Sequence, residues 1–265
     1  NLLFLGTNTK AYLEDSGTLY DITPIRKTSN LGANPITTQS AGTGVIRVTD
    51  VGHGATLGDF VTFSGATAVD GLTTANLNKE QQSTAIIDND TYQLDTGGTS
   101  SSGSTAGGGS SIVAVYQINI GLNTTVLGPG WGAGTWGRFT WGSGAGSLAG
   151  QTLRLWFADD FGEDLLMNIA DGDIYYWDAS GTTNTRAVSL SSLAGASDVP
   201  TVARKVLVSE VDRHVLCFGA NPIGETAQDP LLIRWSSQES LTDWTPSATN
   251  TAGDIRLSQG SEIVT

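Results

Sequence analysis

The chain has 265 residues, which is long enough for one large domain or for one domain that carries a smaller insertion. Its 26 acidic and 13 basic residues give a formal net charge of −13, which excludes a long-range positive field that would draw nucleic acid toward the protein. A single cysteine, Cys217, excludes an intrachain disulfide and a metal site built from several thiolates.

The negative charge has two interpretations. It keeps a protein soluble, because a net charge far from zero opposes association. It also suits a surface that must not adhere to a polyanion, such as the wall of a channel through which DNA slides.

Glycine is the most informative part of the composition. The chain contains 34 glycines in 265 residues, nearly twice the usual share of about 7%. Glycine, serine and threonine together favour tight turns and disfavour long helices. We therefore predict an all-β fold.

The two ends of the sequence both read as parts of strands. Residues 2–5 are apolar and lack the basic flank of a signal peptide, and residues 261–265 resemble the middle of another strand. No stretch approaches the ~18 consecutive apolar residues of a membrane span. We expect a portion of a longer polypeptide that has no membrane-spanning segment.

A repeated pattern indicates the architecture. Residues 19–24 and 241–246 both end a strand with Asp-x-Thr-Pro, and each follows an apolar strand with an aromatic residue, at 11–13 and 232–235. A third strand of this kind spans 174–178. Repeated hairpins with aromatic ends, in a glycine-rich chain without helical periodicity, are typical of β-propeller blades.

The first part of the chain predicts a hairpin and a half over residues 2–24. Pro24 removes a backbone donor and ends the pairing there. Residues 26–44 are polar and rich in turn-forming residues, so we interpret them as a connection that leaves the first domain.

The pattern of expected strands changes between residues 45 and 116, where the strands are shorter and alternate between apolar and polar residues. Strict alternation of apolar and polar residues at 60–63 predicts a strand with one buried and one solvent-exposed face. We predict a small β-barrel at 42–117, inserted between propeller segments 1–41 and 118–265. The expected strands are 45–48, 60–63, 84–87, 91–94 and 112–116. A Gly, Ser and Thr run at 97–111 predicts a flexible exposed loop.

A loop rich in glycine and tryptophan follows at 128–146, with Trp131, Trp136 and Trp141 at intervals of five. Each indole offers a large apolar face and an N–H that needs a partner. The loop therefore either covers the propeller face or contacts another subunit.

The rest of the chain predicts about two blades of strands. Asp171 and Gly172 favour a two-residue hairpin turn, because this pair tolerates positive φ angles. The expected strands are 153–157, 165–169, 174–177, 187–190, 205–208, 215–218 and 231–235.

The residues that carry chemistry are sparse. His53 and His214 have no partner at metal-ligand spacing, so we interpret both as turn or edge positions. The acidic residues at 159–164 could meet around a calcium ion, but they lack the spacing of a loop site and favour a solvated hairpin tip. We predict no catalytic, cofactor-binding or metal-binding residue, no cofactor and no enzyme.

Residues 237–244 resemble a degraded Asp-box, the turn pattern of sialidase-type propellers. Glu239 stands in place of its Asp and Leu241 in place of its Gly. The turn is structural in those enzymes. Glycosidase chemistry would need two carboxylates that face each other across a sugar, and sequence spacing does not establish that.

Four segments resemble proteins of phage tails. Residues 53–66, followed by 90–94, are similar to a small β-barrel module of tail proteins that is distantly similar to the first catalytic-cysteine-half domain of ubiquitin-activating enzymes. Ala55 replaces the usual Leu after its His-Gly. Residues 130–137 and 234–257 are similar to the propeller-type tail nozzle, or hub, proteins of short-tailed phages.

This resemblance implies a structural protein of the virion tail. The expected assembly is a homo-oligomeric ring, usually a hexamer, around the DNA exit channel below the portal and its adaptor. Its partners would be further copies of itself, the adaptor, and tail fibres or other tail proteins, while DNA passes non-specifically during ejection.

Two rival hypotheses remain. A receptor- or glycan-binding tail protein would stack exposed tryptophans such as Trp136 on sugar rings. A glycosidase-like propeller would use a carboxylate such as Glu239.

Overall fold

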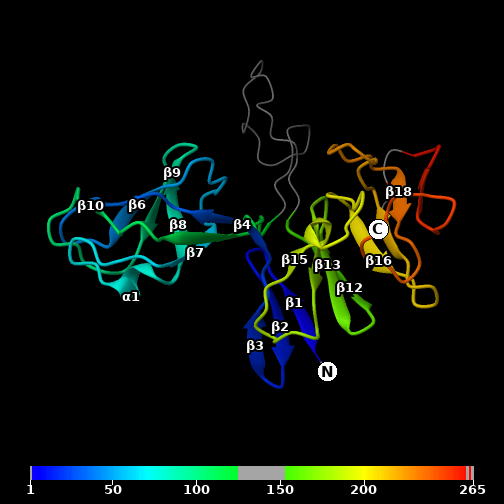
Figure 1. The fold of residues 1–265 in the computed structure, drawn as a ribbon, viewed down its shortest axis with the longest axis horizontal. Helices are drawn as coiled ribbons and strands as arrows, with labels where there is room; N and C mark the ends of the chain where they lie inside the picture. The colour runs from blue at the N-terminus through cyan, green and yellow to red at the C-terminus, as the bar shows by residue number, and fades with distance from the viewer. Residues whose placement is uncertain (1, 125–152, 261–262, 264–265) are drawn as a thin grey trace, which may run out of the picture. The chain divides into compact units, whose positions relative to one another are not determined.

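The computed structural model describes residues 2–124, 153–260 and 263, which form two compact units. The chain of one unit is continuous from Thr23 to Ile120, and we call it the inserted unit. The other, the split unit, joins residues 1–22 to residues 121–265 (Figure 1). Regular structure in the described residues is almost entirely antiparallel strand, apart from the short helix α1 (Thr74–Leu77) and a 3₁₀ turn at Leu190–Ser192. The all-β prediction is confirmed.

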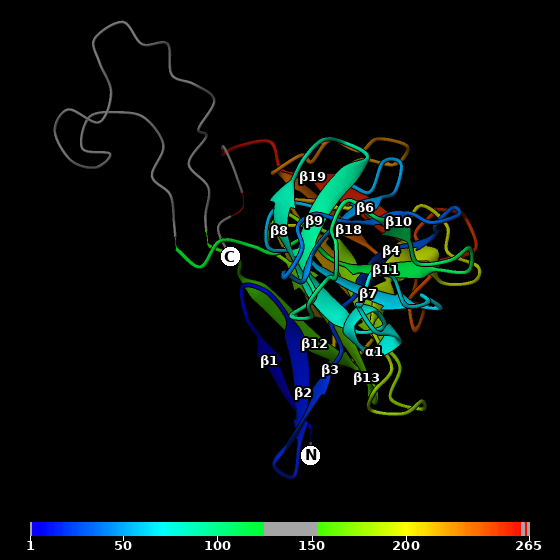
Figure 2. The ribbon, with the colours of Figure 1, turned by 90° about the vertical axis from the view of Figure 1, so that its left-hand side faces the viewer.

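The inserted unit is one sheet of eight strands in the order β10-β5-β6-β9-β8-β7-β11-β4, curled into a half-barrel (Figure 2). Its strands are β4 (Ile25–Asn30), β5 (Ile36–Thr38), β6 (Val45–Thr49), β7 (Phe60–Ser64), β8 (Glu80–Ile86), β9 (Thr91–Asp95), β10 (Ala106–Gly107) and β11 (Val113–Gln117). Every neighbouring pair is antiparallel.

The core of the inserted unit follows the alternation of its strands. Val61 and Phe63 are buried, whereas Phe60 and Thr62 on the other face of β7 are partly exposed. Burial of apolar area at about 25 cal/mol per Å² makes this core the main stabilising term of the unit. It contains residues from five strands, among them Ile36, Ile46, Val48, Tyr92, Leu94, Ala114 and Tyr116.

The inserted unit is wider than the predicted range 42–117. It begins at Thr23 because β4 pairs with β11, with Lys27 opposite Tyr116, and β5 pairs with β6. Residues 23–41, which the sequence assigned to the propeller, therefore belong to the inserted unit. Its two ends meet where Ile118 N donates to Pro24 O at 3.0 Å.

The glycine- and serine-rich run at 97–111 differs from the flexible loop that its composition predicts. Asp70 holds it: Oδ1 accepts hydrogen bonds from Ser102 N at 2.9 Å and Ser102 Oγ at 2.7 Å, and Oδ2 accepts from Gly103 N at 2.7 Å and Thr38 Oγ1 at 2.8 Å. These bonds, led by that from Ser102, lower the pKa of Asp70 to about 2. Hydrogen bonds to a charged acceptor are strong enough to offset the entropy of ordering.

We expect Asp70→Ala to make this loop more mobile, because four hydrogen-bond donors lose the carboxylate that accepts from them. Hydrogen exchange at the amides of Ser102 and Gly103 should accelerate. In the wild type the pKa falls from the ordinary 3.8 to about 2, so the stabilisation is present above pH 3.8 and is lost as the pH falls toward 2. Asp88→Ala is the control, because Asp88 Oδ1 caps only its own turn at Asp90 N. Unchanged hydrogen exchange at Ser102 and Gly103 in Asp70→Ala would contradict the conclusion that Asp70 orders this loop.

The split unit contains three antiparallel sheets, in chain order (Figure 1). The first sheet is β1 (Leu3–Gly6), β2 (Ala11–Asp15) and β3 (Thr18–Asp21). The second is β12 (Trp156–Phe161), β13 (Asp164–Ile169), β14 (Ile174–Trp177) and β15 (Val188–Ser189). The third is β16 (Lys205–Val208), β17 (Val215–Phe218), β18 (Leu232–Trp235) and β19 (Gly253–Arg256). Each is a meander, and four-stranded meanders are compatible with propeller blades.

The second sheet packs on both faces. On one face Trp156 meets Phe4 of the first sheet edge to face, with ring centroids 6.0 Å apart, and its Nε1 donates to Thr7 O at 2.7 Å. A Cβ on Gly6 would lie 2.5 Å from the Trp156 ring, so this contact needs a glycine. On the other face Leu166 and Ile174 share a core with the third sheet.

A buried amide ties the second sheet to the third. Asn168 is fully buried in β13, where its Nδ2 donates to Ala203 O at 3.0 Å and its Oδ1 accepts from Val206 N at 3.1 Å. Both partners are backbone groups, so the contact sets the register of one sheet against the next.

We expect Asn168→Ala to lower the free energy of unfolding by about 1–3 kcal/mol, because it leaves a buried N–H and a buried C=O without partners. Denaturant unfolding measures the loss. Asn250→Ala is the matched control: Asn250 makes three hydrogen bonds, to Asp243, Thr245 and Ser247, as Asn168 does once its bond to Ile169 O is included, but Asn250 lies in a half-buried turn that water reaches. An equal loss in the two variants would contradict a special role for the buried amide.

Candidate functional site

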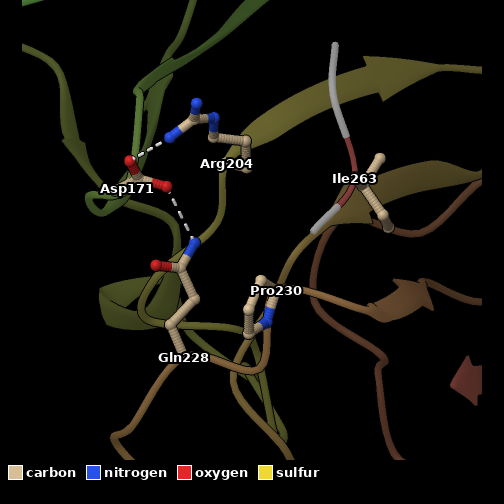
Figure 3. Close-up of a pocket in the computed structure, with 5 residues that line it drawn as sticks. All are labelled: Asp171, Arg204, Gln228, Pro230 and Ile263. Atoms are coloured by element: carbon tan, nitrogen blue, oxygen red, sulfur yellow. Dashed lines mark hydrogen bonds and ion pairs between the residues drawn. The ribbon is translucent and has the colours of Figure 1, made fainter. Parts of the chain in front are cut away.

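A polar pocket of about 190 Å³ lies in the split unit, lined by Asp171, Arg204, Gln228, Pro230 and Ile263 (Figure 3). Asp171 stands between two donors: Arg204 Nη1 donates to its Oδ2, and Gln228 Nε2 donates to its Oδ1 at 3.0 Å. Gln228 also donates to Gly219 O at 2.8 Å, which fixes the carboxamide. Pro230 and Ile263 form the apolar side, where Ile263 N donates to Pro230 O at 3.0 Å.

Local backbone structure positions these side chains. Asp171 lies in the turn between β13 and β14 and adopts a φ of 57°, while Gly172 does not need a positive φ. The predicted hairpin forms between β13 and β14. Its connection is longer than the two residues expected, because the last pair of the ladder is Asn168 with Ile174. Ala203 N donates to Gly172 O at 2.9 Å and brings Arg204 to this turn.

The pocket has the chemistry of a small polar binding site. Arg204 and Asp171 are both about one third exposed, and one guanidinium has five N–H donors, so donors remain for a ligand. Its volume is below the ~300 Å³ of ordinary small-molecule sites. The five lining residues include no nucleophile with an adjacent base, which is the minimum for covalent catalysis.

The acidic residues at 159–164 bind backbone and side-chain donors. Asp159 Oδ2 accepts from Val208 N at 2.7 Å. Asp164 accepts from Tyr176 OH at 2.8 Å and from Ala179 N at 2.9 Å. Residues 2–124, 153–260 and 263 contain no group of three or more His, Cys, Asp or Glu side chains that could hold a metal ion.

The two histidines occupy different environments. His53 is 1% exposed: its Nδ1 accepts from Ala55 N at 2.9 Å, so the ring is protonated at Nε2, which donates to Asp88 O at 3.1 Å. From the sequence we predict a turn position for His53 between two glycines, and this prediction does not include its burial. His214 stands just before β17, half-buried, and its Nδ1 donates to Ser236 O at 2.7 Å.

The inserted unit holds a buried hydroxyl pair that the sequence did not indicate. Tyr92 OH and Tyr116 OH lie 2.9 Å apart, and Tyr116 OH donates to Asp50 Oδ2 at 2.6 Å. Burial raises the pKa of both phenols, so both stay protonated at neutral pH. The Arg26 guanidinium lies 5.2 Å from the Tyr116 ring centroid. These groups form a structural network inside the core.

The segment that resembles an Asp-box forms a packed turn. Trp244 is 1% exposed and its Nε1 donates to Leu241 O at 2.9 Å. Glu239 is exposed at the tip with a φ of 53°. Ser197 N donates to Thr242 O at 2.8 Å and anchors the turn to a neighbouring loop. These contacts fix the conformation of the turn.

The glycine- and tryptophan-rich loop lies outside the described residues, and with it Trp131, Trp136 and Trp141. The helix α1 has only four residues, so no helix in the described part of the chain is long enough to cross a membrane.

No protein-family model matches the chain, and no curated protein matches its sequence. Among solved structures, the chain is weakly similar to the phage phi92 endosialidase, with 11% sequence identity over 99% of this chain and a TM-score of 0.29. The chain spans 38% of the length of that protein.

Cys217 is the one thiol of the sequence, and it lies fully buried in β17. Burial raises the pKa of this thiol, so its thiolate, the reactive form, is scarce at neutral pH. We expect an aromatic disulfide reagent to modify the native protein slowly and the denatured protein completely. Val211→Cys, at a position 89% exposed, is the control that should react at once. Rapid labelling of native Cys217 would contradict the burial.

Proposed function

We propose that this chain is a structural protein of a phage tail, and more narrowly a subunit of the ring-shaped nozzle or hub around the DNA exit channel. It would serve as a conduit during genome ejection and would have no enzymatic activity. Its proposed partners are further copies of itself, the adaptor next to the portal, and tail fibres or other tail proteins. The proposed location is the tail of the virion.

The observation that carries the proposal is the concentration of negative charge on a scaffold of meander sheets. The split unit holds 19 Asp and Glu against 9 Lys and Arg, a net charge of −10, whereas the inserted unit holds 7 against 4, a net charge of −3. Like charge repels phosphate, so DNA would pass such a surface without adhering to it.

The use of the polar groups also supports a structural role. The described carboxylates that make close contacts hold loops, turns and neighbouring strands, as Asp70, Asp159 and Asp164 do. The resemblance of residues 53–66, 130–137 and 234–257 to tail proteins points the same way.

The second candidate function is glycan binding by a tail receptor protein. It is favoured by the pocket in Figure 3, where a guanidinium, a carboxylate and a carboxamide converge. These groups match the hydroxyl and carboxylate groups of sugars. It predicts saturable binding of host envelope saccharides that is lost in Arg204→Ala and kept in Arg47→Ala, a change at an exposed arginine of β6.

Electron microscopy of the native particle tests the first proposal. We expect this chain in a symmetric ring with an open axial channel in the distal half of the tail, and with acidic side chains of the split unit on the channel wall. Peripheral spikes, or no ring, would contradict the conduit and would leave glycan binding as the better explanation.

A further inference from the structure

The three sheets of the split unit form a stack whose two end faces have no sheet against them in the described residues. The second sheet is covered on one side by the first and on the other by the third. Alternation along each strand then assigns every residue of the first and third sheets to a covered face or a free face.

The free face of the third sheet is apolar. Its covered face carries Val206, Val215 and Cys217, which share a core with the second sheet. The opposite face is made of two cross-strand rows, Leu207, Leu216, Trp235 and Gly253 in one and Lys205, Phe218, Ile233 and Ile255 in the other. Leu207 is 37% and Ile255 53% exposed. Lys205 turns away, with its Nζ 5.2 Å from the ring centroid of Phe157 in the second sheet.

The free face of the first sheet exposes three leucines on its two edge strands. It carries Leu3, Leu5 and Leu19, which are 55%, 38% and 57% exposed, together with Tyr12. Two carboxylates share this face: Glu14 Oε1 accepts from Gly17 N at 2.6 Å, and Asp21 forms ion pairs with Lys10 and Arg186. The covered face carries Ala11 and Leu13, which are buried. Exposed apolar patches of this kind mark interaction sites.

We propose that these two faces bind each other in neighbouring copies of this chain: the third sheet of one copy packs on the first sheet of the next. This contact continues the succession already present within the chain, where the first sheet packs on the second and the second on the third. The two faces are different surfaces, so the contact is head-to-tail, and repeated head-to-tail contacts close into a ring when the rotation permits.

The packing within the chain also indicates which strands would meet. Inside the chain β12 contacts β16, so the first strand of one sheet lies against the first strand of the next. The same arrangement between copies places Leu207 of β16 opposite Leu3 of β1. Packed sheets lie about 10 Å apart, within reach of a short bifunctional thiol reagent.

Cross-linking in purified protein tests the contact. Leu3→Cys and Leu207→Cys are made in separate chains, mixed, and treated with a bismaleimide of about 10 Å reach. We expect a covalent dimer in the mixture and none from either variant alone. Cys217 is fully buried and does not compete. Leu3→Cys mixed with Val211→Cys is the matched control and should give no dimer.

Sedimentation provides the second measurement. The wild type should form oligomers at increasing concentration, and Leu207→Lys or Leu19→Lys should raise the apparent dissociation constant at least about tenfold. Val211→Lys should leave it unchanged. Both target residues are exposed in the single chain, so circular dichroism should show an unaltered fold.

A wild type that stays monomeric, or Leu207→Cys chains that cross-link to one another, would overturn the head-to-tail contact. The inference deepens the ring proposed above, yet it is tested on purified protein. A ring seen in the particle without this cross-link would overturn the interface alone, and the cross-link without a tail location would overturn the tail function alone.

Discussion

The split unit depends on one constraint: its second sheet is apolar on both faces. Met167, Tyr175 and Trp177 point to one side, whereas Leu166 and Ile174 point to the other, and all five are buried. A sheet of this kind is stable only when other layers cover both sides. The first and third sheets supply those layers, and the buried Asn168 fixes one of them through backbone groups that would otherwise lack partners.

Hydrogen bonds within each unit explain how the chain tolerates a long insertion. The first sheet ends at Asp21, and Ile22 remains held by the split unit, because its O accepts from Ala187 N at 3.0 Å. On return, Gly121 N donates to Asn8 O at 2.7 Å. The inserted unit closes its own ends through Ile118 and Pro24. Each unit therefore has its own core, and each holds its own chain ends with its own hydrogen bonds. For this reason the chain of the split unit can accommodate the inserted unit.

Polar side chains in this protein are used mainly to shape the backbone. Asp59 illustrates the pattern: it is 2% exposed, and its Oδ1 accepts from Ile120 N at 2.8 Å while its Oδ2 accepts from Thr56 N at 2.6 Å. Asp70 and Asp164 act in the same way on other turns. A carboxylate in such a role accepts hydrogen bonds from several donors and holds the backbone of its turn in place.

The sequence by itself determined the fold class and most strands, because alternation and turn residues act over a few positions; residues 60–63 and Asp171 are examples. Tertiary structure decided the rest. Composition alone predicted a flexible run at 97–111, but its order comes from Asp70, about 30 residues away in the chain. The start of the inserted unit at Thr23 comes from pairing between β4 and β11, and the burial of His53 comes from packing on Tyr92, with ring centroids 4.9 Å apart. Tertiary structure also decides which sheet faces other described residues cover. The pattern of the strands indicates apolar faces, but it does not indicate which neighbour covers them.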